Sequence, residues 1–193
     1  MLFILCGCLS FLLFIIYDIN QITIKNKIIN SFFVFGFVLL CISTVQLSLT
    51  VDMLIFIPLF WKILFGVLAG VFLFLLFYSL FFALPFQKTY MDSGFLIKKV
   101  YDKGVYAMSR HPGVLFFFFF YVFYSLFLGN VIVLIAGLIF TLLNVVYIFI
   151  QDKIIFPKQF ENYQKYIEST PFLIPTKKSM NSCIVTLSMR QES

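Results

Sequence analysis

The sequence contains few charged residues. Asp, Glu, Lys and Arg together make up only 11% of the 193 residues, whereas they make up about 25% of an ordinary soluble domain. Hydrophobic residues account for 62% of the chain, and the mean hydropathy is +1.05. A core of this chain length cannot bury so much apolar surface. The composition therefore excludes a soluble globular domain and predicts an integral membrane protein in contact with the lipid bilayer.

Metal ligands are also scarce. His111 is the single histidine, and the four cysteines lie too far from it, and are too irregularly spaced, to form a metal site. We therefore predict that the protein binds no metal. The sequence also lacks a phosphate-binding glycine loop, a dinucleotide fingerprint and a nucleophile elbow, so neither a P-loop protein nor a serine hydrolase is indicated.

The net charge of +6 does not indicate nucleic-acid binding, because Lys and Arg flank apolar blocks instead of forming one patch. Of the 14 Lys and Arg residues, all except Lys62 lie in residues 18–30, residues 85–112 or the region after residue 150. The positive-inside rule predicts that these three regions are cytoplasmic and that the N-terminus is outside.

Five apolar blocks approach the length of about 20 residues that a membrane-spanning helix needs. We expect spans at residues 2–17, 31–49, 61–84, 113–128 and 131–150. Residues 18–30 are expected to be a polar connection, residues 50–60 a turn, and Gly129-Asn130 a tight turn. The predicted fold class is therefore all-α, an integral membrane protein with about five transmembrane helices.

Two further helices are expected outside the spans. Asp92 could cap a short amphipathic helix that lies on the membrane surface and stops at Gly104, just before the Arg110-His111-Pro112 corner. Residues 151–169 are predicted to form a cytoplasmic C-terminal helix, interrupted at Pro157. Residues 176–193 are predicted to be a mobile tail.

The polar residues of the last span and of the corner each allow two interpretations. Asn144, Tyr147 and Gln151 recur at intervals of three and four, so they share one helix face. That face could make hydrogen bonds between helices, or it could belong to a site. His111 could be a solvated side chain at the membrane surface or a functional group, and Arg110 could simply bind lipid phosphate.

Two motifs flank the predicted helical hairpin. Gly104-Val105-Tyr106 is followed by Arg110-His111-Pro112, and after the hairpin Tyr163 and Tyr166 precede the segment Pro171 to Pro175. In this order the motifs resemble those of the isoprenylcysteine carboxyl methyltransferase and phospholipid methyltransferase family. Members of that family are integral membrane enzymes that use S-adenosylmethionine. The resemblance covers about residues 94 to 175.

The resemblance implies roles for particular positions. The residues implied to bind the cofactor are Val100, Gly104, Tyr106, His111, Pro112, Gln151 and Asp152. The implied catalytic residues are Arg110 and His111, and the implied substrate-binding residues are Arg110, Asn144 and Tyr147. It also implies three parts: an N-terminal three-span region (1–86), a methyltransferase-like region (87–175) with the hairpin 113–150, and the tail (176–193).

The sequence departs from the family pattern at three places. Gln151-Asp152 stands where the family has paired glutamates, Tyr147 where it has an arginine, and Val114 where it has a tyrosine. The resemblance implies an S-adenosylmethionine-dependent methyltransferase with a lipid-like or prenylated acceptor, while the departures weaken prenylcysteine itself as that acceptor. Two alternatives stay open: an inactive relative that acts as a membrane binding or scaffold protein, and a nicotinamide-dependent membrane reductase, since the Arg-His-Pro corner also resembles sterol reductases.

Overall fold

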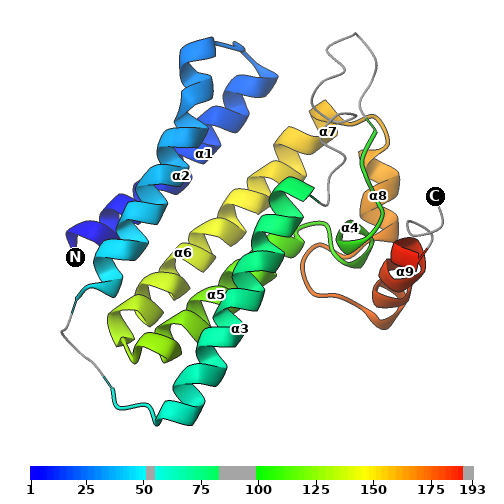
Figure 1. The fold of residues 1–193 in the computed structure, drawn as a ribbon. Helices are drawn as coiled ribbons and strands as arrows, with labels where there is room; N and C mark the ends of the chain where they lie inside the picture. Colours follow the sequence, from blue (N-terminus) through cyan, green and yellow to red (C-terminus); the bar gives the residue numbers. More distant parts are fainter. Residues whose placement is uncertain (51–54, 83–98, 189–193) are drawn as a thin grey trace. The chain divides into compact units, whose positions relative to one another are not determined.

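The computed structural model describes residues 1–50, 55–82 and 99–188 (Figure 1). Its elements are α1 (Leu2–Ile22), α2 (Lys27–Ser48), α3 (Leu59–Phe77), the π-helical turn η1 (Tyr78–Phe82), α4 (Val105–Met108), α5 (Pro112–Leu128), α6 (Val131–Ile150), the π-helical turn η3 (Gln151–Ile155), α7 (Phe156–Gln159), α8 (Tyr163–Ser169) and α9 (Lys177–Ser188). The chain folds into two compact units. Unit 1 comprises Met1–Phe72 and Phe117–Ile155, and unit 2 comprises Leu73–Phe116 and Phe156–Ser193.

Four helices among the described residues are long and apolar enough to cross a membrane: Leu2–Ile22, Lys27–Ser48, Leu59–Phe82 and Val131–Gln159. Pro112–Leu128 is a shorter apolar helix of 17 residues. Large apolar side chains remain exposed along these helices, as lipid contact requires. The predicted fold class, an all-α membrane protein, is confirmed.

The α5–α6 hairpin follows the expected bounds closely. Gly129 has a φ of +66° at the turn, and a side chain there would collide with the Ile55 carbonyl. The Asn130 side chain caps α6 by accepting hydrogen bonds from the backbone N–H groups of Ile132 (2.9 Å) and Val133 (3.2 Å). Its amide nitrogen also donates to the Thr50 carbonyl at 2.9 Å, so the hairpin turn is fixed to the end of α2.

The connection between the first two helices is shorter than the sequence predicts. Residues 18–30 are expected to be a polar connection, but α1 continues to Ile22 and α2 begins at Lys27. The Asn20 amide donates to the Asn26 carbonyl and to Asn30 Oδ1, both at 2.9 Å, and Asn26 in turn caps α2. These residues are helical because their polar groups find partners on the neighbouring helix.

The core of unit 1 lies where α1, α5 and α6 meet. Phe140 of α6 is fully buried and contacts the rings of Phe11 on α1 and Tyr121 on α5. Two glycines allow this close packing, because a Cβ at Gly7 would overlap Phe140 and a Cβ at Gly137 would lie 2.5 Å from Tyr121 Cβ. The helices are therefore held by aromatic rings that pack against glycine surfaces.

The two helices expected outside the spans have different outcomes. Most of the expected surface helix lies outside the described residues. Lys99 to Lys103, its expected last turn, is not helical, so Gly104, with a φ of +61°, precedes α4 instead of ending a helix. The C-terminal helix expected over 151–169 is present as η3, α7 and α8.

The region expected to be a mobile tail contains the helix α9. Ser179 and Cys183 of this helix are buried, and burial raises the pKa of the Cys183 thiol. Amphipathic spacing in residues 177–188 is the signal that predicts this helix.

Candidate functional site

The Arg110-His111-Pro112 corner connects α4 to α5 within unit 2. Ser109 is extended (φ −152°, ψ 149°) and ends α4, and Pro112 is the first residue of α5, a position that proline favours. The Ser109 hydroxyl accepts a hydrogen bond from the His111 backbone N–H at 3.3 Å. The corner is therefore a defined turn between two helices.

Both motifs of the sequence pack against each other in unit 2. The Arg110 backbone N–H donates to the Pro171 carbonyl at 3.0 Å, and the Ser109 hydroxyl donates to the Phe172 carbonyl at 3.2 Å. The Tyr166 hydroxyl donates to the Tyr106 carbonyl at 2.7 Å. These three hydrogen bonds join residues about 60 positions apart in the sequence, so the two motifs form one local structure.

His111 is buried in a group of rings, which we call the aromatic cluster: His111, Phe156, Tyr163 and Phe172. The imidazole is only 7% exposed; its centroid lies 5.8 Å from that of Phe156 in a stacked arrangement and 5.2 Å from that of Phe172 edge-on. The guanidinium carbon of Arg110 lies 5.5 Å from the Phe172 ring centre. His111 is therefore not a solvated surface side chain.

The other predicted cofactor residues of unit 2 also make hydrogen bonds to neighbouring elements. The Tyr106 hydroxyl donates to the Ser79 carbonyl of η1 at 2.8 Å. The backbone N–H of Val100 donates to Asn162 Oδ1 at 2.7 Å, and that of Gly104 donates to Thr186 Oγ1 at 2.9 Å. Unit 2 thus brings Val100, Gly104, Tyr106, Arg110, His111 and Pro112 into one network with α8 and α9.

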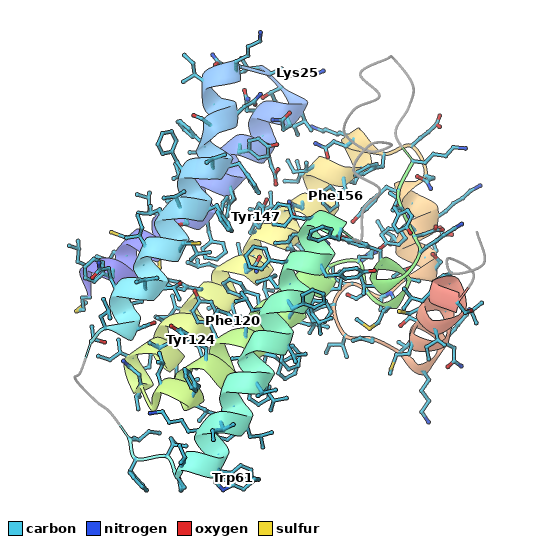
Figure 2. The ribbon with its side chains drawn as sticks, in the orientation of Figure 1. Lys25, Trp61, Phe120, Tyr124, Tyr147 and Phe156 are labelled. Carbon is cyan, nitrogen blue, oxygen red and sulfur yellow. The ribbon has the colours of Figure 1, made fainter. Side chains whose placement is uncertain are left out.

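The polar face of α6 belongs to unit 1 and bonds to α1. Gln151 Nε2 donates to Asp18 Oδ2 and to the Tyr147 hydroxyl, each at 2.8 Å, and Tyr147 also makes a hydrogen bond to Asp18. The Tyr147 ring, labelled in Figure 2, packs against Phe14 of α1 at 5.9 Å. The interpretation of this face as interhelical hydrogen bonding is therefore confirmed for Tyr147 and Gln151.

Asp18 is the functional candidate that sequence reasoning missed. It is only 8% exposed and lies within α1, although the sequence predicts a polar connection at residues 18–30. A signal was available, because Ile15, Ile19 and Ile22 continue the helical apolar spacing past Asp18. A carboxylate in a membrane span is a functional hypothesis by default.

Asn144 and Asp152 also belong to unit 1. Asn144 is half-buried on α6, and Asp152 is 1% exposed in η3. That these residues and the His111 corner enclose one cavity stays a prediction.

No family model, curated protein or solved structure matches the chain. Among the residues that the structure describes, no group of three His, Cys, Asp or Glu side chains is placed to hold a metal ion. A buried imidazole between aromatic rings, beside a guanidinium, suits a ligand with a flat ring, a cationic centre or an anionic group.

Proposed function

We propose that the chain is a membrane-embedded S-adenosylmethionine-dependent methyltransferase whose acceptor is lipid-like or prenylated. The observation that supports this proposal is the packing of the two motif segments on each other through Arg110–Pro171, Ser109–Phe172 and Tyr166–Tyr106. A chance likeness in two separate short segments gives no reason for those segments to meet. Segments of one cofactor site, in contrast, must meet.

The residues of unit 2 fit the proposed cofactor. S-adenosylmethionine, when bound, supplies a methyl group that its sulfonium charge has already activated. The aromatic cluster and Tyr106 offer ring surfaces that favour a cationic sulfur and an adenine ring. The protein then needs only to align the acceptor, which can lower the barrier by about 7–11 kcal/mol. Cofactor roles for Gln151 and Asp152 stay predictions.

Arg110 and His111 have different roles in this proposal. Arg110 carries a permanent charge beside the Phe172 ring and attracts an anionic group of the acceptor. His111 is fixed between two rings and orients the ligands. Arg110, Asn144 and Tyr147 are the proposed acceptor-binding residues. We also propose that the N-terminus is outside and that 85–112 and the C-terminal region are cytoplasmic, so that the cofactor enters from the cytoplasm and the acceptor enters from the bilayer.

Cofactor binding by the purified full-length protein tests this proposal. In lipid nanodiscs, calorimetry is expected to detect S-adenosylmethionine binding that weakens at least about tenfold in His111→Ala, which corresponds to about 1.4 kcal/mol. Gln164→Ala, an exposed change on α8, is the matched control and should bind as the parent does. Thermal unfolding of each variant separates lost binding from lost folding. A parent protein that does not bind S-adenosylmethionine would overturn the proposal.

A second candidate function is a binding or scaffold protein without catalysis. The observation that favours it is that the Gln151 amide already donates to both Asp18 and Tyr147 within the spans. Transfer of a labelled methyl group into a whole-membrane extract separates the two functions, because cofactor binding without transfer indicates the scaffold. Thermal shifts with a nicotinamide cofactor in place of S-adenosylmethionine test the reductase alternative.

A further inference from the structure

The packed side of α9 is formed by small and polar side chains. Ser179 and Cys183 are buried, and Thr186 accepts the hydrogen bond from the Gly104 backbone N–H. These three residues recur at intervals of four and three, so they share one face. In Figure 1, α9 lies beside α4. Thr186 of the packed face bonds to Gly104, at the start of the segment that leads to the Arg110 corner.

A second stripe on α9 is apolar and exposed. Met180, Ile184 and Leu187 also recur at intervals of four and three, next to the packed face, and they are 50%, 64% and 37% exposed. Ser182 lies on the opposite side of the helix, and it is exposed too. Lys177 and Lys178 begin the helix and are exposed. Lys177 precedes Met180 by three residues and therefore borders the stripe, whereas Lys178 lies on the side of Ser182. An exposed apolar stripe with a lysine at its edge is typical of helices that lie in a membrane interface.

We propose that α9 lies on an anionic lipid surface, with the stripe of Met180, Ile184 and Leu187 inserted among the acyl chains. Lys177 fits this partner because it places positive charge beside anionic headgroups while its stem remains near the apolar stripe, and Lys178 adds a second positive charge at the same end of the helix. The chain is also long enough for α9 to reach the bilayer. The last membrane-length helix ends at Gln159, and the segment between it and Lys177 spans at most about 60 Å.

The lipid contact has a consequence for the segment before the corner. Because Thr186 binds the Gly104 N–H, an α9 held on the membrane also fixes the point where α4 begins. This inference does not depend on the proposed methyltransferase activity, since it concerns only α9 and its lipid partner.

A single tryptophan reporter tests the inference in the full-length protein. Trp61 is the only tryptophan, so Trp61→Phe combined with Ile184→Trp leaves one indole, on the stripe. In nanodiscs with brominated lipid we expect quenching at least about twofold stronger than for the control Trp61→Phe/Ser182→Trp. Quenching should increase when phosphatidylglycerol replaces part of the phosphatidylcholine, and Lys177→Glu/Lys178→Glu should remove that increase.

Three results would overturn the inference. Equal quenching at positions 184 and 182 would show that the stripe is not inserted. An indole at 184 that is open to an aqueous quencher would show the same. An indole that is shielded from water but not quenched by brominated lipid would assign the stripe to a protein partner or to a second copy of the chain. Unchanged thermal unfolding of both tryptophan variants confirms that each is folded.

Discussion

Asp18 shows at the level of one residue how a carboxylate can be kept inside a membrane helix. It accepts hydrogen bonds from Tyr147 of α6 and from Gln151, the first residue of η3. We predict that Asp18→Leu destabilises the protein by about 1–3 kcal/mol, because Gln151 and Tyr147 lose their acceptor in a buried position. Asp18→Asn keeps an acceptor oxygen and should cost less. Unfolding by sodium dodecyl sulfate in mixed micelles measures both values.

A control variant and a double variant test the role of Asp18 further. Glu168→Gln changes an exposed acidic residue of α8 and should alter the free energy of unfolding by less than about 0.5 kcal/mol. Tyr147→Phe combined with Asp18→Leu should cost less than the sum of the single changes, because both act on the same hydrogen bonds. Additive costs, or an Asp18→Leu protein as stable as the parent, would contradict the role given to this group.

Helix packing in unit 1 depends on where glycine stands. A Cβ at Gly137 would lie 2.5 Å from Tyr121 Cβ, which cannot move without its backbone, whereas a Cβ at Gly70 of α3 has no atom within 4 Å. We predict that Gly137→Ala destabilises the protein by about 1–3 kcal/mol through overpacking. Gly70→Ala is the matched control and should stabilise α3 by about 0.5–1 kcal/mol. Thermal unfolding in detergent compares the two, and equal effects would contradict the packing.

The elements that the sequence predicts well are those with local boundaries. The hairpin of α5 and α6 is an apolar run interrupted by Gly129-Asn130, so both composition and turn chemistry indicate the same bounds. The end of α1 is different, because the buried partners of Asp18 lie more than a hundred positions away in the sequence. The helix α9 likewise is held in place by its buried face.

Sequence spacing indicated which parts of the two motifs of unit 2 belong together, but not what surrounds them. The spacing of the two motifs indicated that Tyr106, His111 and Tyr166 belong together, and the bond between Tyr166 and Tyr106 joins those motifs. Sequence alone could not reveal that His111 is buried, because the rings that cover it, Phe156 and Phe172, come from segments 45 and 61 positions later. Burial is a property of tertiary contacts, whereas a motif reports only local order.

At the scale of the whole molecule, charge separates the two ends of unit 1. Lys25, in the α1–α2 turn, and Trp61, at the start of α3, lie at opposite ends of this unit in Figure 2. At the end where Lys25 lies, Lys27 is the first residue of α2. At the opposite end, Lys62 follows Trp61 in α3. Asp18 lies four residues before the end of α1 on the side of Lys25, Gln151 bonds to it, and Lys153 follows Gln151 by two residues. The positive-inside rule is the basis for our proposal that this end is cytoplasmic.

Whether α5 crosses the membrane decides the topology of the chain. Its 17 residues span about 26 Å as a helix, slightly less than the hydrocarbon thickness of about 30 Å. However, Tyr121 of α5 packs on Gly137 and Phe140 of α6, and a two-residue turn joins the two helices. Because α6 is long enough to span the membrane, we predict that α5, packed beside it, crosses as well.

Three epitope tags test this topology by protease accessibility in intact and permeabilised cells. With five crossings, a tag before Met1 is cut in intact cells, whereas tags after Ser193 and between Lys25 and Asn26 are protected until the membrane is opened. The internal tag is the control, because it reports the α1–α2 turn and does not depend on α5. If α5 did not cross, the tag after Ser193 would be cut in intact cells while the internal tag stayed protected. That outcome would place the C-terminal region, with α9, on the side opposite to the basic α1–α2 turn, and would contradict the cytoplasmic site proposed for this protein.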